Sequence, residues 1–152
     1  MGIRINRWRI EPLGNEHHCS GFSCAVSERL DNFLKHEALK QAGHDLNRTY
    51  VALDPEEPGL KAVAGYYTIS ASQVVREVLP IDAPDPYPAL PVLHLGRLAV
   101  DYRHQGEGLG THLVMDAFSL AARLSTQIGI FGVDLVAGDG EARTWWRKRG
   151  FL

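Results

Sequence analysis

The stretch that decides the fold reads Leu98-Ala-Val-Asp-Tyr-Arg-His-Gln-Gly-Glu-Gly-Leu-Gly-Thr-His-Leu-Val114. It passes from a short apolar run, through a turn with three glycines at alternate positions, into a helical pattern. Glycine leaves the backbone N–H groups of a turn uncovered, and the N-terminus of the following helix adds the positive end of its dipole. This order therefore predicts a cradle for an anion such as a pyrophosphate.

Composition limits the classes of protein to which the chain can belong. Its 152 residues and 45% hydrophobic content predict a single domain, 1–152, with a substantial core. The formal net charge of −2 gives no bulk attraction to nucleic acid, although a local basic patch stays open. Cys19 and Cys24 are too few for a disulfide framework or a zinc site, so we expect no metal.

Targeting signals are not evident in the sequence. The first residues lack the apolar run of a secretory signal, and no later segment approaches the roughly 20 apolar residues of a membrane span. We therefore expect a soluble cytoplasmic protein that does not associate with membranes.

The apolar pattern predicts strands alternating with helices. The expected strands are Ile3–Leu13 (at a sheet edge), Thr49–Asp54, Ala62–Ser70, Val92–Val100 and Phe131–Ala137. The expected helices are Ser27–Ala42, Gly108–Ser125 and Glu141–Arg149. The five prolines of Pro80–Pro91 predict an irregular loop. The fold class is α+β, or mixed α/β, with at least one right-handed parallel crossover.

The glycine turn has three competing interpretations. A dinucleotide-binding fold would place Gly-x-Gly-x-x-Gly after its first strand, whereas Gly106-x-Gly108-x-Gly110 comes after about a hundred residues. A P-loop is excluded because no Gly-Lys-Ser/Thr ends the turn. A loop whose glycines satisfy only tight geometry stays open.

The third interpretation follows from a resemblance. Val100-x-x-Arg103-x-x-Gly106-x-Gly108-x-Gly110 resembles the acetyl-coenzyme A motif of the GNAT family of N-acetyltransferases. The resemblance implies acetyl-CoA as cofactor and the GNAT fold, a central mixed, splayed β-sheet flanked by helices, here without the family's last strands. The positions implied in cofactor binding are Leu98, Ala99, Val100, Arg103, Gln105, Gly106, Glu107, Gly108, Leu109, Gly110 and Thr111.

Three further segments resemble one branch of that family, the acetyltransferase toxins of toxin–antitoxin systems. They are Phe22–Lys35, Asn47–Val51 and His94–Arg103. The resemblance implies a type II toxin that acetylates the amino group of aminoacyl-tRNA and inhibits translation, with a small ribbon-helix-helix antitoxin as partner. It is also compatible with a homodimer. Two alternatives stay open: an attenuated toxin that binds acetyl-CoA and its antitoxin without efficient catalysis, and an N-acetyltransferase acting on a small amine or a protein.

The chemistry singles out two catalytic candidates. Acetyl transfer to an amine needs a neutral nucleophile and a proton for the leaving thiolate. In the family a tyrosine early in the last helix supplies that proton, and Trp146 occupies its position here. Because an indole N–H is too weak an acid for this role, the usual general acid is missing. His94 is a candidate base toward the acceptor amine, with an ordinary hydrogen-bonded strand histidine as the competing interpretation.

Cations supply the candidate contacts with nucleic acid. Arg143, Arg147, Lys148 and Arg149 lie close together, with tryptophans between them. Cations interleaved with aromatic rings can grip phosphates and stack on bases, while a solvated helix end is the equally open alternative. Arg97 suits a phosphate backbone if it faces the acceptor cleft, and a surface or ion-paired arginine is the alternative.

Overall fold

The computed structural model describes residues 8–54, 56, 59, 61–78 and 87–136, together with the backbone of 137, 142–147, 150 and 151. Its strands are β1 (Arg9–Pro12), β2 (Arg48–Leu53), β3 (Val63–Val75), β4 (Ala89–Val100), β5 (Gly132–Ala137), β6 (Ala142–Arg147) and β7 (Gly150–Phe151). Its α-helices are α1 (Glu28–Asn32), α2 (Ala38–Gly43) and α3 (Leu109–Leu124), and a π-helix (Phe33–Glu37) joins α1 to α2. Single 3₁₀ turns lie at Arg76–Val78 and Tyr102–His104.

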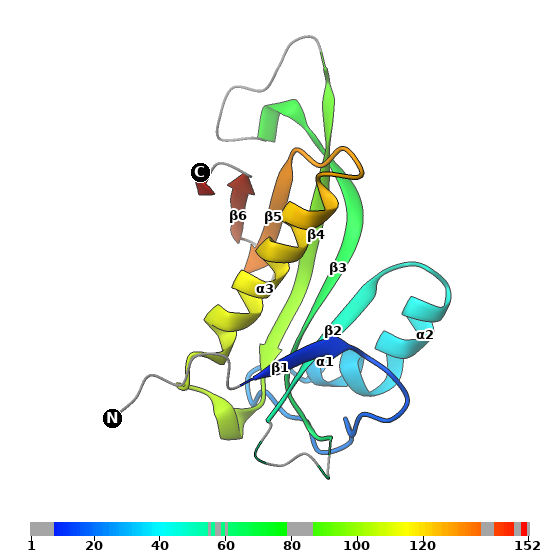
Figure 1. Cartoon of the computed structure of the whole chain (residues 1–152), viewed down its shortest axis with the longest axis vertical. Helices are drawn as coiled ribbons and strands as arrows, with labels where there is room; N and C mark the ends of the chain where they lie inside the picture. The colour runs from blue at the N-terminus through cyan, green and yellow to red at the C-terminus, as the bar shows by residue number, and fades with distance from the viewer. Residues whose placement is uncertain are drawn as a thin grey trace. The chain divides into compact units, whose positions relative to one another are not determined.

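The sheet is mixed, as the sequence predicts. Its hydrogen-bonded neighbours follow chain order from β1 to β7 (Figure 1). β1 runs antiparallel to β2, β4 parallel to β5, and β5 antiparallel to β6. The parallel pair β4–β5 is connected through α3, which is the expected crossover.

The chain divides into two compact units. The first comprises Met1–Thr68 with Arg97–Val114, and the second comprises Ile69–Gly96 with Met115–Leu152. β3, β4 and α3 each contribute to both units. Among the described residues, none of the helices is of the length and apolarity that a membrane crossing requires.

The first unit has its core between the helical stretch and the strands. Ser27 caps α1 by accepting a hydrogen bond from the Leu30 N–H at 3.3 Å. The helical stretch then buries one face, and α2 packs on β2. The core cluster consists of Phe22, Cys24, Phe33, Leu34, Ala38, Val51, Leu53, Val63, Tyr66 and Ala99.

The second unit has buried side chains on its strands and on α3, including Leu93, Leu95, Phe118 and Val133. Val74, Leu90 and Val92 are buried together, and Phe131 packs against them. The Arg76 N–H donates to the Pro88 carbonyl at 2.9 Å, which ties the end of β3 to the chain just before β4.

The structure confirms most of the predicted elements within the described residues. The predicted edge strand is confirmed at Arg9–Pro12, and its first five residues lie outside the described part of the chain. The predicted loop Pro80–Pro91 is too long, because β4 already begins at Ala89 and includes Pro91. Its residues 80–86 lie outside the described ranges.

The predicted helix Glu141–Arg149 is wrong. Residues 142–147 form β6, which pairs with β5 from Gly132↔Arg147 to Ala137↔Ala142. Thr144 and the two tryptophans that follow it favour strands, and the neighbouring edge of β5 offers backbone partners along the whole segment. β6 and β7 are thus strands after β5 that the sequence did not predict.

Candidate functional site

A buried carboxylate shapes the turn that follows β4. Asp101 is 0% exposed and begins the 3₁₀ turn Tyr102–His104. Its carboxylate accepts hydrogen bonds from the Ser23 N–H at 3.1 Å and from the Arg103 N–H at 2.9 Å. Two segments far apart in sequence are therefore joined at one side chain.

Arg103 completes that arrangement with its guanidinium. Its Nε donates to one oxygen of Asp101 at 2.8 Å and its Nη2 to the other at 3.2 Å, a two-point geometry that fixes the plane of the group. Burial acts to raise the pKa of Asp101, but the hydrogen bonds from Arg103 and Ser23 outweigh it and lower the pKa. Asp101 therefore stays ionised as the anchor of the turn.

Gln105 fastens the next part of the turn. Its side-chain amide donates to the Cys24 carbonyl at 2.8 Å and to the Val100 carbonyl at 3.1 Å. The Tyr102 N–H also donates to the Ser23 carbonyl at 2.7 Å. The side chain of Gln105 thus holds the loop against the end of β4, so its predicted role in cofactor binding would be to position the backbone.

Two glycines adopt a conformation that other residues rarely accept. Gly106 has φ +80° and Gly108 has φ +88°. A Cβ atom built on either would meet no heavy atom within 4 Å, so the space beside the turn is open. The backbone of the turn can therefore be approached closely by a ligand.

The N-terminus of α3 follows directly. The His112 N–H donates to the Gly108 carbonyl at 3.1 Å, so the N–H groups of residues 109–111 precede the first intrahelical donor. Leu109 is buried, and a Cβ at Gly65 would lie 3.0 Å from its Cδ2 and 3.1 Å from the Ala99 carbonyl oxygen. This close packing fixes α3, a 16-residue helix, with its positive end beside the open turn, an arrangement that fits a pyrophosphate.

The remaining predicted cofactor positions surround this turn. Ala99 is buried, Leu98, Val100 and Gly110 are half-buried, and Glu107 and Thr111 are exposed. The parallel pairing of β4 with β5 runs from Val92↔Gly132 to Leu95↔Leu135, while β4 itself continues to Val100. The strand end Leu98–Val100, which the resemblance implies in cofactor binding, thus extends beyond the part of β4 that pairs with β5.

His94 is hydrogen-bonded to an aspartate in the second unit. Its Nδ1 lies 2.9 Å from Oδ1 of Asp134, which is 2% exposed and sits opposite it on β5. The His94 side chain is 30% exposed. Gly96 leaves room for the imidazole, since a Cβ there would lie 2.8 Å from its Nε2. Only the parallel register brings the two residues together, so Asp134 could not be recognised from sequence alone.

The C-terminal candidates lie in or near β6. Trp146 pairs with Val133, and Arg143 with Val136, in the backbone register. Arg147 pairs with Gly132, whereas Lys148 and Arg149 lie outside the described residues. Arg143 and Arg147 lie in a strand, so the alternative of cations at a helix end is wrong for these two residues.

Arg97 lies in the first unit beside an aromatic ring. Its guanidinium carbon is 3.8 Å from the centroid of Phe33. Across the described ranges, no acidic group lies within ion-pair distance of Arg97, which speaks against the ion-paired alternative.

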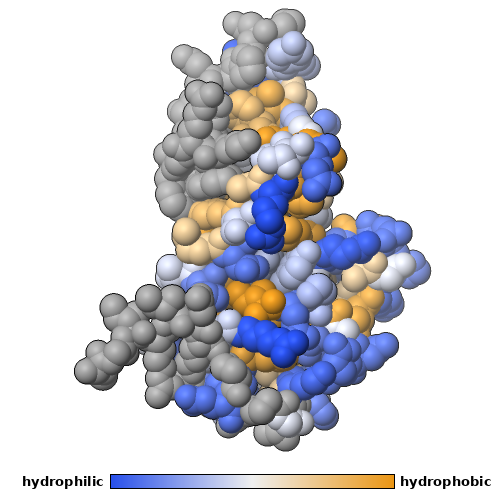
Figure 2. Space-filling view, in the orientation of Figure 1, coloured by the Kyte–Doolittle hydropathy of each residue, from blue (hydrophilic) through white to orange (hydrophobic). Residues whose placement is uncertain are grey.

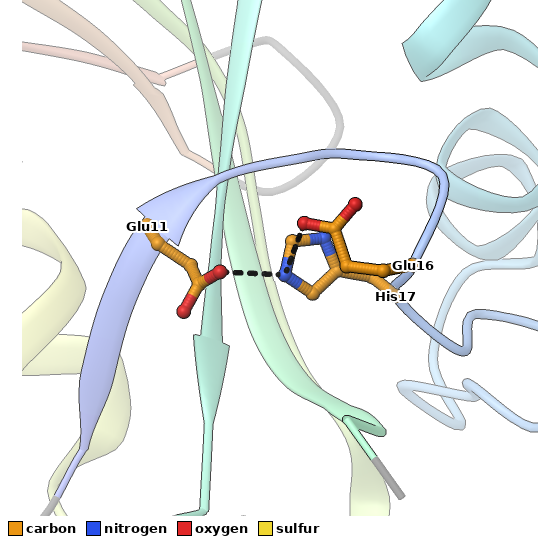
Figure 3. Close-up of side chains that lie close together, drawn as sticks. All are labelled: Glu11, Glu16 and His17. Carbon is orange, nitrogen blue, oxygen red and sulfur yellow. Dashed lines mark hydrogen bonds and ion pairs between the residues drawn. The ribbon is translucent and has the colours of Figure 1, made fainter.

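Glu11, Glu16 and His17 gather where the chain leaves β1 (Figure 3). The Gly14 N–H donates to Nδ1 of His17 at 2.9 Å, so the ring proton must sit on Nε2. That Nε2–H donates to Glu11 at 3.0 Å, and Glu16 lies 3.8 Å from the same nitrogen. A nitrogen that carries the proton cannot also bind a metal ion, so this arrangement acts as a clasp between β1 and the following loop.

The face drawn in Figure 2 shows hydrophilic residues with apolar residues between them. In the first unit, the exposed side chains of the helical stretch include Glu28, Arg29, Asn32, His36 and Lys40.

Comparison with known proteins gives consistent matches. A family model described as "Acetyltransferase (GNAT) family" matches residues 15–151. A tRNA-acetylating toxin of Mycobacterium tuberculosis is 31% identical over 121 residues, which cover 77% of this chain and 68% of that protein.

Solved structures agree with these matches. AtaT complexed with an acetyl-methionyl-tRNA has a TM-score of 0.81 and 26% identity, and the match covers 93% of this chain and 95% of that one. A mutant AtaT toxin bound to the C-terminus of the antitoxin AtaR and to acetyl-CoA has a TM-score of 0.76 and 25% identity, with 95% of each chain covered.

Proposed function

This chain belongs to the acetyltransferase (GNAT) family, and we propose that it transfers the acetyl group of acetyl-CoA to the amino group of an aminoacyl-tRNA. The observation that carries the proposal is the open glycine turn, Gly106 and Gly108 at positive φ, next to the N-terminus of α3. Bound acetyl-CoA supplies the acetyl group as a reactive thioester. The chain's part is to hold the cofactor's pyrophosphate and to position the acceptor.

The cofactor would be held mainly by backbone. The N–H groups between Gln105 and Thr111 would donate to the pyrophosphate, and the strand end Leu98–Val100 would bind the pantetheine arm. Arg103 adds positive charge near the turn while its guanidinium plane stays fixed on Asp101. Residues 1–152 would act as one acetyltransferase domain, which the family match over 15–151 supports.

Aminoacyl-tRNA is the acceptor we favour because one relative is described as a tRNA-acetylating toxin and AtaT was solved in complex with an acetyl-methionyl-tRNA. The protein would then be the toxin of a type II toxin–antitoxin system, acting on translation in the cytoplasm. Its antitoxin would be a small ribbon-helix-helix protein, and the AtaT–AtaR complex supports such a partnership.

For the proton transfers we propose His94 as the base. With Nδ1–H donated to Asp134, the lone pair of Nε2 is available to take the proton of the acceptor amine. His94→Gln should lower kcat/KM, because the acceptor amine loses its proton acceptor, whereas the control His44→Gln, at an exposed position, should leave kcat/KM unchanged. An unchanged kcat/KM in His94→Gln would assign His94 to strand structure only.

The test of the function is direct. Purified protein is incubated with labelled acetyl-CoA and a mixed pool of aminoacyl-tRNAs, and label is expected in the RNA as N-acetylaminoacyl-tRNA. If acetyl-CoA binds but no RNA is labelled, the function is not this one. Label on a small amine or a protein would instead support the alternative acceptors.

The variant Trp146→Tyr distinguishes an active toxin from an attenuated one. If the missing acid limits the enzyme, Trp146→Tyr should raise the rate of labelling. If neither protein labels RNA, the missing tyrosine does not explain the inactivity.

A further inference from the structure

A groove in the first unit lies outside the cofactor turn. It has a volume of about 570 Å³ and runs along α1, the π-helix and α2, with Arg97 of β4 as the contribution from the sheet. It is lined by Glu28, Arg29, Asn32, Phe33, His36, Glu37, Gln41 and Arg97. All of these side chains except Phe33 are polar, so the groove is suited to a polar ligand.

Arg97 is the outer member of a stack of three flat groups, of which Arg97 and Phe33 line the groove. The Phe33 ring stacks on Tyr66 with centroids 6.2 Å apart and planes 24° apart, and Arg97 lies 3.8 Å over Phe33. Tyr66 is fixed in turn, because its hydroxyl donates to the Leu30 carbonyl at 2.6 Å. The guanidinium is therefore held by its face before any ligand arrives.

Stacking leaves the edge of the guanidinium for other partners. A guanidinium carries five N–H donors in its plane, and none of them is used in stacking. Among the described residues no acceptor is hydrogen-bonded to Arg97, in contrast to Arg103 and Arg48, which both pair with aspartates. Arg97 is thus a preorganised donor that can bind an anion at two points.

The backbone beneath the groove is unusual at the same place. The five residues Phe33–Glu37 form a π-helix between two short α-helices, and three of them line the groove. π-helical turns are rare and occur frequently at functional sites. Here the irregular turn contains both the ring that supports Arg97 and the neighbouring His36.

The charges of the groove are mixed. Arg29 and Arg97 are cationic, while Glu28 and Glu37 are anionic, and Lys40 pairs with Glu37 at 2.8 Å. Duplex nucleic acid presents rows of phosphates, which a wall with carboxylates would repel. The end of a single strand presents few phosphates with bases beside them, and it fits one free guanidinium better.

We propose that this groove binds the single-stranded 3′-terminal nucleotides of the acceptor RNA. The edge of Arg97 donates two hydrogen bonds to a phosphate, and a base stacks on the face that is turned away from Phe33. This inference rests on the proposed function and deepens it by assigning part of the acceptor site.

Binding is measured by fluorescence anisotropy with a labelled RNA minihelix that carries a tRNA-like single-stranded 3′ end. Arg97→Gln should raise the Kd at least about tenfold, the usual cost of losing charged hydrogen bonds. The Kd of Arg97→Lys should lie between those of the wild type and Arg97→Gln, because lysine keeps the positive charge but lacks the planar guanidinium. The matched control Arg48→Gln, a substitution at an exposed arginine paired with Asp45, should bind as the wild type does. A blunt minihelix should bind weakly and show no effect of Arg97.

Equal binding of wild type, Arg97→Gln and Arg97→Lys would overturn the inference, as would a loss for the blunt minihelix as large as for the 3′-extended one. A loss confined to an acidic deca-glutamate peptide would mark a peptide groove and would also overturn it. Because binding is measured without acetyl transfer, a failure of the proposed function can be told apart from a failure of the groove assignment. RNA binding that depends on Arg97 without acetylation contradicts only the proposed function, and acetylation with an unchanged KM for tRNA in Arg97→Gln contradicts only the groove assignment.

Discussion

Arg97 and Arg103 flank the same strand end, yet their surroundings differ in one respect. Arg103 meets the buried carboxylate of Asp101 at two points, and with it shapes the turn after β4. Arg97 meets the face of Phe33 and has no carboxylate among the described residues. A cation that is neutralised by a buried anion contributes to structure, whereas one supported only from its face keeps its donors for a ligand.

The two arginines should therefore contribute to different properties, Arg103 to the stability of the fold and Arg97 to the binding of RNA. Changes on the Arg103 side should appear mainly in the free energy of unfolding, and changes on the Arg97 side mainly in binding to RNA. Measuring both quantities on the same variants therefore shows whether the two arginines differ in this way.

The largest loss of stability is expected from Asp101→Asn. The substitution leaves Arg103 without its anion and replaces one of the two carboxylate oxygens that accept from the part-buried N–H groups of Ser23 and Arg103, which should cost about 3 kcal/mol in the free energy of unfolding. Urea denaturation measures it, with Asp45→Asn, at an exposed position, as the control. If Asp101→Asn loses no more free energy of unfolding than the control does, the Asp101 carboxylate does not stabilise the turn.

A smaller loss is expected from Arg103→Gln. The Arg103 side chain is 52% exposed, so water replaces part of what its ion pair contributes, and we expect a cost of about 1 kcal/mol. The same denaturation series measures it, and a loss equal to that of Asp101→Asn would mean that the ion pair alone holds the turn.

The pH dependence should follow the lowered pKa of Asp101. Because the folded protein holds the ionised carboxylate, this stabilisation is fully present above the ordinary carboxyl pKa of about 3.9 and is lost as pH falls through the lower folded value. The difference in stability between wild type and Asp101→Asn should therefore be constant from neutral pH to about pH 5 and shrink in more acidic solution. A difference that grows on acidification would contradict the assigned direction.

The smallest change in stability is expected from Arg97→Gln. Loss of one partly exposed contact with Phe33 should cost no more than about 0.5–1 kcal/mol, although RNA binding changes at least about tenfold. Thermal unfolding and anisotropy on the same samples test the contrast. It fails if Arg97→Gln is as unstable as Asp101→Asn.

Much of the sheet and the long helix α3 could be predicted from sequence, because their apolar periodicity is strong over many residues. The segment Glu141–Arg149 could not, since nine residues with two tryptophans fit either period and pairing with β5 decides the outcome. Pro91 similarly concealed the start of β4, because proline is tolerated at particular positions within strands.

The site was predicted where it depends on local backbone and not where it depends on distant partners. Gly106 and Gly108 can be recognised because their spacing is short and their conformation specific. The bond from Ser23 to Asp101 and the pair His94–Asp134 arise only when strands and loops meet. The support of Arg97 by Phe33 depends in addition on a π-helical turn that has no simple sequence pattern.

The most direct test of the central claim is calorimetric titration of acetyl-CoA into wild type and Gly108→Val. A valine at φ +88° would be strained and its side chain would fill the open space beside the turn, so the variant should bind at least about 100-fold more weakly. Gly129→Val, at a glycine with open surroundings and no such φ, should bind as the wild type does. Equal affinity in all three proteins would contradict the assignment of this turn as the cofactor cradle.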